Sequence, residues 1–394
     1  GEDNPIVSIH DQGAGGNGNV LKEFTEPLGA AYDVRGILIG DDTMSVMEIW
    51  GAEYQENCAF LIKPESRAVV AAISEREKCP VAFLGSESGD GRVVLTDSAA
   101  PQADDSEDRR SIPVDLPLEL VLGKMPPKTF VDSSDNIQRT PLSFPSDLTV
   151  SSALDRVLRL LSVGSKRFLV HKVDRSVTGL CAQQQCVGKL LLPLADCAVV
   201  AHSMLSNTGT VCACGEQPIK GLLGAGAQAR LTVAEAVTNM MFAAVESLGH
   251  AKCSANWMWA AKLPGEAARM WVACEALRDA LIEVGVGVDG GKDSLSMAAK
   301  CGDEVVKAPG QITVTAYNTC TDITLTVTPD LKAKVGETSK LLMVTLPQGN
   351  GALGGSALAQ VFAQLGSDCV DCSISDLGVL REVFKASQEL LREK

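Results

Sequence analysis

The feature that most constrains the fold is the alternation of strand-like and helix-like runs along the chain. Within residues 1–97, short apolar runs typical of strands alternate with stretches that have helical spacing. The strand-like runs are 6–9, 59–62, 81–84 and 92–95, and the helix-like runs are 20–24 and 67–78. Gly-Asp-Gly in SESGDGR indicates a hairpin turn. The pattern predicts an α/β (or α+β) unit.

A second unit of the same kind is expected after residue 145. It contains helix-like stretches from 229 and over roughly 265–284, and the strand-like segments FLVHKV, LLLPLAD and QITVTAYNTC. LLMVTL and a glycine-rich turn begin a third unit, which is too short to stand alone. We therefore expect domains over residues 1–145, 146–330 and 331–394, which suits a length of 394 residues. The polar, acidic residues 98–112 are interpreted as a mobile insertion in the first domain.

The composition is that of a globular protein and narrows the possible partners. Hydrophobic residues make up 45% of the chain and charged residues 21%, which is enough for a substantial core. A net charge of −14 argues against nucleic acid as a partner. It leaves open phosphate ligands, because backbone N–H groups and a bridging metal can hold them. Since no run of 18 apolar residues exists, we expect neither a membrane span nor a membrane partner.

The thirteen cysteines lie mostly within apolar runs. That placement favours buried free thiols in a cytoplasmic protein over a disulfide framework. Cys212-x-Cys214 and Cys369-x-x-Cys372 are the close pairs. They lie far apart in the sequence, with no histidine near either, so a zinc site is the less favoured alternative.

An aspartate and a pair of residues four apart form the most informative polar group. Asp196 closes LLLPLAD, so its carboxylate is expected at the mouth of a buried strand. Glu235 and Asn239 lie in QARLTVAEAVTNMMFAAVESL, a helix-like stretch in which residues four apart share one face. Two carboxylates and a side-chain carbonyl suit Mg²⁺, which prefers oxygen ligands and usually brings phosphate oxygens with it. The leading hypothesis is therefore a bound nucleotide–Mg²⁺ complex.

The segment HDQGAGGNGN, residues 10–19, lies between a strand-like and a helix-like run and allows three interpretations. Gly13, Gly15 and Gly18 satisfy the dinucleotide pattern G-x-G-x-x-G, but no second strand ending in an acid is evident. A purely structural turn is the second interpretation. We favour the third, in which Asp11 reaches a cation while backbone N–H groups of the loop face anionic ligand oxygens.

Three further segments have both a functional and a structural interpretation. In EIWGAEYQEN, Glu53 and Gln55 share one face of an alternating stretch and suit a polar substrate, unless the stretch is a solvated sheet edge. Lys166 precedes a strand-like segment and offers the charge that a phosphate needs, although most such lysines are surface residues. GLLGAGAQAR places a glycine-rich loop before the Glu235 helix, either as an anion site or as a flexible loop.

Together these segments resemble one family, the large single-chain phosphoribosylformylglycinamidine synthases of purine biosynthesis. Seven motifs are similar to its signatures, in its order, and the match covers nearly the whole chain outside residues 98–112. They are HDQGAGGNGN, EIWGAEYQEN, DRSVTGLCAQQQCVG, PLADCAVVAHS, AEAVTN, SANWMWAAKLPGE and GGKDSLSM. The resemblance implies the AIR-synthetase-like C-terminal domain of a first half, followed by the N-terminal domain of a second half and the start of its C-terminal domain.

The resemblance also implies an ATP-dependent ligase reaction for the parent protein. Formylglycinamide ribonucleotide, ATP and glutamine give the amidine, ADP, phosphate and glutamate. ATP phosphorylates the formyl amide oxygen, and ammonia from a glutaminase domain then displaces the phosphate. Mg²⁺ and ATP or ADP are the implied cofactors. The chain lacks the family's catalytic-histidine and glutaminase domains, so we interpret it as a central fragment without catalytic residues and inactive alone.

Three site residues of the first half are implied by the same resemblance. Asp11 matches a metal ligand of the catalytic half, and Glu53 and Gln55 match its substrate-contacting E-x-Q motif. Two alternatives remain open for the chain as a whole. One is a single-half relative, such as aminoimidazole ribonucleotide synthetase or selenophosphate synthetase, which the passage into a second half argues against. The other is a non-catalytic nucleotide-binding scaffold.

The second half would hold an auxiliary nucleotide that is structural rather than catalytic. Lys166 and Ala195 match nucleotide contacts of that site. Asp196, Glu235 and Asn239 match its magnesium ligands. The chain stops before the family's HD-x-S-D-G-G motif, which supplies a further ligand in the family.

Overall fold

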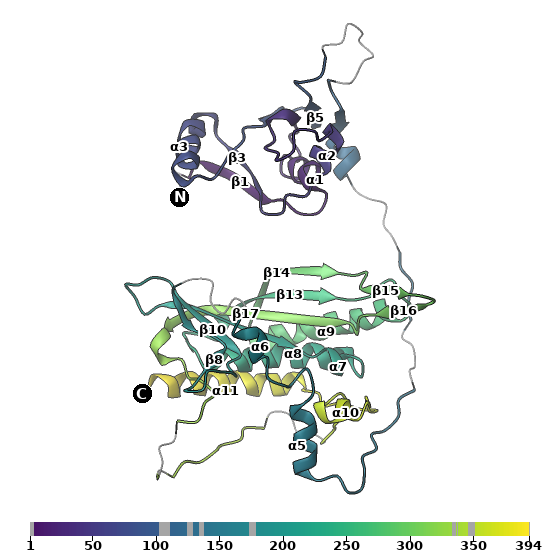
Figure 1. Cartoon of the computed structure of the whole chain (residues 1–394), viewed down its shortest axis with the longest axis vertical. Coiled ribbons are helices and arrows are strands. Elements are labelled where there is room, and N and C mark those ends of the chain that lie inside the picture. Colours follow the sequence, from purple (N-terminus) through teal and green to yellow (C-terminus); the bar gives the residue numbers. More distant parts are fainter. Residues whose placement is uncertain are drawn as a thin grey trace. The chain divides into compact units, whose positions relative to one another are not determined.

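The computed structural model divides into two compact units, Gly1–Thr129 and Phe130–Lys394 (Figure 1). It describes residues 4–101, 111–123, 129–133, 138–172, 179–332, 336, 338–345 and 351–393. Most of the predicted acidic insertion, residues 102–110, therefore lies outside the described residues. Both units combine sheets with helices, which confirms the predicted α/β (α+β) class.

Two small sheets form the first unit. β1 (Ile6–Asp11) pairs antiparallel with β3 (Cys58–Ile62), and a second sheet has the order β4-β2-β5-β6. The strands of this second sheet are β2 (Ala30–Asp33), β4 (Gly85–Glu87), β5 (Arg92–Thr96) and β6 (Val114–Pro117). The helices are α1 (Gly16–Glu23), α2 (Val46–Gly51), α3 (Arg67–Glu77) and α4 (Leu118–Leu122). Val20, Ile49 and Leu95 lie in the core that joins them.

The predicted hairpin at SESGDGR is wrong. β2 lies between β4 and β5, antiparallel to the first and parallel to the second. Residues 81–84, predicted as a strand, have no regular structure. The glycines of SESGDGR indicate only that the chain turns there. The strands on either side of the turn pair with β2, which lies some fifty residues upstream in the sequence, and not with each other.

A sheet of the order β14-β13-β17-β11-β10-β7, with β12 paired to β17, dominates the second unit. β13 and β14 are parallel, and the other neighbours are antiparallel. The strands are β7 (Cys181–Gln183), β10 (Cys197–Ala201), β11 (Gly209–Glu216), β12 (Ala244–Val245), β13 (Lys252–Met258), β14 (Gly287–Ser294) and β17 (Gln311–Asp322). Two ladders stand apart from this sheet: β8 (Cys186–Val187) with β9 (Leu192–Pro193), and β15 (Ala298–Cys301) with β16 (Glu304–Lys307).

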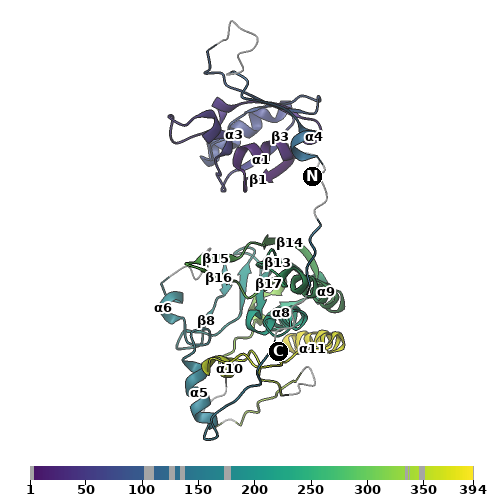
Figure 2. The ribbon, with the colours of Figure 1, turned by 90° about the vertical axis from the view of Figure 1, so that its right-hand side faces the viewer.

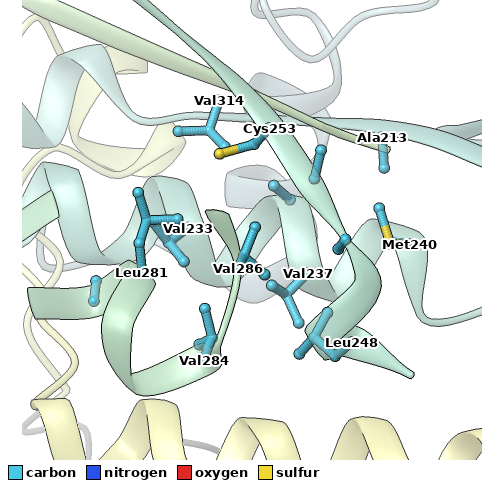
Figure 3. Packing of buried hydrophobic residues seen from close by; sticks show 14 of the residues in the cluster. Ala213, Val233, Val237, Met240, Leu248, Cys253, Leu281, Val284, Val286 and Val314 are labelled. Carbon is cyan, nitrogen blue, oxygen red and sulfur yellow. The ribbon is translucent and has the colours of Figure 1, made fainter. Parts of the chain in front are cut away.

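Helices cover one face of the large sheet. α8 (Ala225–Met240) and α9 (Glu266–Val284) pack on it, and α11 (Ile374–Arg392) lies beyond them (Figures 1 and 2). Buried residues alternate with half-exposed ones along most of β17, as expected for a strand covered on one side. In Figure 3, Val233 and Val237 of α8 lie among Val286 and Leu281 in the core. The remaining helices are α5 (Val150–Leu158), α6 (Arg167–Val170), α7 (Pro218–Gly221) and α10 (Ala357–Val361).

α11 belongs to the core of the second unit, although it lies in the predicted third domain. A capping box of Ser373 and Asp376 begins the helix, and Leu380 and Phe384 are buried in the cluster that contains α8 and α9. The side chain of Gln388 accepts a hydrogen bond from the Val245 N–H at 2.9 Å. The predicted domain limits 145/146 and 330/331 remain predictions, beside the observed division at 129/130.

All thirteen cysteines are free thiols. Burial raises the pKa of Cys197, Cys253 and Cys372 to about 11, so these thiols stay protonated near neutral pH. No helix in the described part of the chain combines the length and the apolar character needed to cross a bilayer.

Candidate functional site

Glu235 and Asn239 lie one turn apart on α8, as predicted, and both contact the end of β11. The Asn239 Nδ2 donates a hydrogen bond to the Cys214 carbonyl at 2.9 Å. The Glu235 Oε2 accepts one from the backbone N–H of Glu216 at 2.8 Å. Both α8 side chains are half-buried. The helix therefore fixes them against one short stretch of strand, residues 214–216.

Gly215 allows this close packing of α8 on β11. A Cβ atom at Gly215 would lie 2.1 Å from the Thr232 carbonyl oxygen and 2.7 Å from the Ala236 nitrogen. Both are backbone atoms of the helix, so no side-chain movement could relieve the clash. The absence of a side chain at this one position brings the backbone of the strand within hydrogen-bonding reach of Glu235.

Asp196 lies near this stretch but not where the sequence suggested. LLLPLAD is not a buried strand: β9 is a half-buried pair of residues, and Asp196 follows it in a connection and directly precedes β10. Cys197 pairs with Ala213, so the antiparallel register, extended by one residue, places Asp196 opposite Cys214. Asp196 is exposed and makes no hydrogen bond or ion pair with the described residues. Asp196 is therefore near Asn239 because both lie beside Cys214, and not because their side chains are in contact.

These donors fit a hard cation. The Glu235 Oε1 and the Asn239 Oδ1 carry no hydrogen bond from the described residues, and the Asp196 carboxylate is likewise available. Carboxylate and amide oxygens are the donors that Mg²⁺ prefers. Among the described residues, no group of three Asp, Glu, His or Cys side chains could by itself hold a metal. The predicted set has two carboxylates, so it depends on Asn239 and on ligand oxygens.

Lys166 and Ala195 lie on neighbouring elements without touching. The prediction of a strand after Lys166 is wrong, because this residue precedes the short helix α6. Its ammonium donates hydrogen bonds to the carbonyls of Gly164, at 2.6 Å, and Leu161. α6 contacts β9, and the Ala195 N–H donates to the Gln185 carbonyl at 3.1 Å. The Lys166 ammonium therefore binds carbonyl groups of the loop that precedes it. A phosphate would have to compete with these carbonyls for the ammonium group.

In the first unit, the glycine-rich loop meets the E-x-Q segment. The Gly15 N–H donates to the Glu53 Oε1 at 3.2 Å, and the Gln55 Nε2 donates to the Glu53 Oε2 at 3.4 Å. The segment is a turn after α2 rather than the predicted alternating stretch, yet Glu53 and Gln55 do meet. Gly16 has φ +61, and a Cβ there would lie 2.1 Å from the Ala52 carbonyl oxygen. The glycine is required where the two segments cross.

Asp11 ends β1, opposite Cys58, and its exposed carboxylate makes no hydrogen bond with the described residues. β1 pairs antiparallel with β3, which is not the parallel βαβ arrangement of a dinucleotide-binding unit. The dinucleotide interpretation of HDQGAGGNGN is therefore wrong. The favoured interpretation, a metal or phosphate site, stays a prediction, as does the alternative of a structural turn.

A buried amide pair beneath this loop was missed by the sequence analysis. The Gln12 Nε2 donates to the Asn17 Oδ1 at 2.6 Å, and the Gln12 Oε1 accepts from the Tyr54 N–H at 2.5 Å. The Asn17 Nδ2 donates to the Ile49 carbonyl at 2.8 Å. These bonds join the two segments, and Gln12, Asn17 and Tyr54 line a cavity of about 250 Å³. The sequence signal for this pair was that Gln12 and Asn17 are the two amides of residues 12–18, which are otherwise glycine and alanine.

Comparisons with known proteins place the chain. The FGAR-AT PurM_N-like domain model matches residues 165–319, and the model of the C-terminal domain of AIR synthase related proteins matches residues 1–98. A probable phosphoribosylformylglycinamidine synthase, chloroplastic/mitochondrial, of Arabidopsis thaliana is 54% identical over 100% of this chain and 28% of its own length. A phosphoribosylformylglycinamidine synthase of Homo sapiens is 51% identical over 99% of this chain and 29% of its own length.

Solved structures agree on the fold. T. maritima PurL complexed with ATP has a TM-score of 0.58 at 16% identity, covering 84% of this chain and 49% of that one. T. maritima PurL complexed with FGAR has a TM-score of 0.56 at 16% identity, covering 83% and 47%. The predicted resemblance and the two domain types are thus confirmed for residues 1–98 and 165–319. A second C-terminal domain beginning near residue 331 remains a prediction.

Proposed function

Because the chain belongs to the phosphoribosylformylglycinamidine synthase family over its whole length, we propose that it forms part of an ATP-dependent ligase of purine biosynthesis. That enzyme converts formylglycinamide ribonucleotide, glutamine and ATP to the amidine, glutamate, ADP and phosphate. The chain spans less than a third of the length of these relatives. The complete reaction, including ammonia supply by a glutaminase domain, is therefore assigned to a longer protein, and the chain alone is expected to be inactive.

The observation that carries the proposal is the pair of α8 side chains fixed against β11. Glu235 and Asn239 are each anchored through one atom and present a free oxygen, while Asp196 lies next to the same stretch of strand. We assign these three residues to a Mg²⁺ bound by ADP or ATP. When bound, the ion neutralises phosphate charge. Lys166 and Ala195 would contact the nucleotide from the α6 side. The site serves as a structural anchor in this proposal.

Glu53 and Gln55 are assigned to formylglycinamide ribonucleotide, and Asp11 to a metal shared with a domain outside this chain. The Glu53 carboxylate is held by the Gly15 N–H, so it is already oriented as an acceptor for a polar substrate. Gln55 adds an amide that can both donate and accept. T. maritima PurL complexed with FGAR, a structure of the same fold, is consistent with a substrate of this class.

Replacing Glu53 by alanine in a ligase that contains this chain is expected to raise the KM for formylglycinamide ribonucleotide. A hydrogen bond to a charged group contributes about 1.5–3 kcal/mol, so kcat/KM should fall by about 10- to 150-fold. Steady-state kinetics with varied substrate measures this. Glu56→Ala, an exposed carboxylate in the same turn, is the matched control and should leave the KM unchanged. Equal KM values for Glu53→Ala and the parent would remove Glu53 from the substrate site.

A further inference from the structure

We propose that Gln217, held by Lys220, is a positioning residue that makes Glu235 present one carboxylate oxygen, Oε1, to the cation of a metal–nucleotide complex. The inference rests on the proposed role of Glu235 and extends it to two residues that no motif singled out. Gln217 follows β11, and Lys220 lies in α7, the short helix that leads toward α8.

The amide of Gln217 has its orientation imposed by both neighbours. The Lys220 Nζ donates to the Gln217 Oε1 at 2.5 Å, and the Gln217 Nε2 donates to the Glu235 Oε2 at 2.8 Å. An ammonium group can only donate and an ionised carboxylate can only accept. Only one of the two amide orientations satisfies both contacts, so the chemistry of the partners decides it. Lys220 thereby directs the amide N–H groups of Gln217 toward Glu235.

The two oxygens of Glu235 are consequently distinct. Oε2 accepts from the Gln217 Nε2 and from the Glu216 backbone N–H, each at 2.8 Å. A carboxylate oxygen has about two lone-pair sites, so Oε2 is saturated. Oε1 carries no hydrogen bond from the described part of the chain. The side chain is thus anchored through one oxygen, and the other is left for a cation.

Asn239 repeats the arrangement. Its Nδ2 is held by the Cys214 carbonyl at 2.9 Å, which leaves Oδ1 as the free atom. The end of β11 therefore orients both α8 side chains before any ligand binds. Partners of this kind, which hold a metal ligand without touching the metal, typically affect metal affinity about 10- to 100-fold.

The test is calorimetric titration of the whole 394-residue chain with ADP, in Mg²⁺ and in EDTA. Gln217→Met removes the donor at similar length, and we expect the affinity in Mg²⁺ to fall about 10-fold while binding in EDTA is unchanged. Gln311→Met is the matched control. Gln311 donates to the Glu216 carboxylate and to Thr313, not to Glu235, so affinity should match the parent. Lys220→Met should weaken binding in the same direction as Gln217→Met.

A double variant, Gln217→Met with Glu235→Ala, distinguishes the positioning of Glu235 from a general loss of structure. Because Gln217 acts through Glu235, Gln217→Met should have no further effect once Glu235→Ala is present. Parent-like affinity of Gln217→Met, beside weakened Glu235→Ala, would overturn the positioning role and leave the proposed site standing. Parent-like affinity of Glu235→Ala would overturn both. If Gln217→Met does not fold, Lys220→Met tests the proposal in its place. Parent-like Mg²⁺-dependent affinity of Lys220→Met would then overturn the positioning role of Gln217.

Discussion

Replacing Glu235 by alanine is expected to abolish the Mg²⁺ dependence of ADP binding to this chain. The substitution removes the carboxylate that α8 presents beside Asn239, and it leaves the Glu216 N–H and the Gln217 amide without their acceptor. Residues that merely orient a ligand affect metal affinity about 10- to 100-fold, so loss of the ligand itself should cost about 100-fold or more. Titration calorimetry with and without Mg²⁺ measures the effect.

Glu246→Ala is the matched control for this variant. Glu246 directly follows β12, its side chain is 75% exposed, and its carboxylate lies 3.6 Å from the His250 ring. The same substitution there should leave the Mg²⁺-dependent affinity as in the parent. A Glu235→Ala chain that still binds ADP more tightly in Mg²⁺ than in EDTA would show that the cation is held elsewhere.

The second large effect is expected for Gly215→Val. The new side chain would begin 2.1 Å from the Thr232 carbonyl oxygen, so α8 must move off β11. Forcing extra atoms into a packed core typically costs about 1–3 kcal/mol, and a clash with backbone belongs at the upper end. We expect the free energy of unfolding to fall by about 3 kcal/mol and ADP binding to be lost, because Glu235 moves with the helix. Urea denaturation and ADP titration measure the two effects.

Gly290→Val provides the comparison for this glycine. Gly290 lies in β14 of the same sheet, and a Cβ there meets no atom within 4 Å. A substitution at such an exposed position should change stability by no more than about 0.5 kcal/mol. If Gly215→Val and Gly290→Val unfold at the same urea concentration, the close approach of α8 to β11 does not support the site.

Helical periodicity predicted the elements that carry the α8 side chains. The helices at 67–78 and 265–284 and the one from 229 were expected from apolar spacing, and α3, α9 and α8 follow them closely. The prediction of a buried strand at LLLPLAD was wrong because hydrophobicity alone does not make a strand. Leu191, with φ 48 in the left-handed region, directly precedes β9, and Pro193 at the other end lacks an N–H, so β9 is limited to two residues. Residues 168–170 of FLVHKV lie in α6 instead of a strand.

The arrangement of the candidate site was predictable where residues share one helix and not where distant segments supply partners. Glu235 and Asn239 follow from spacing along α8. Gly15 and Glu53 are 38 residues apart, and no local sequence pattern indicates the hydrogen bond between them. Gln12 and Gln217 were overlooked for the same reason, because an amide reveals its role only through the groups that it bridges. Asp196 was placed at the wrong end of a strand, yet the register of β10 with β11 brings it to the same region.

The most direct test of the nucleotide–metal assignment is a crystal structure of the chain with Mn²⁺ and ADP, using the anomalous signal of manganese to locate the ion. The account predicts a peak about 2.0–2.5 Å from the Glu235 Oε1 and the Asn239 Oδ1, with the Asp196 carboxylate and a phosphate oxygen completing the contacts. Bound ADP whose manganese peak lies away from α8, with Glu235 keeping its Oε1 free, would contradict the account.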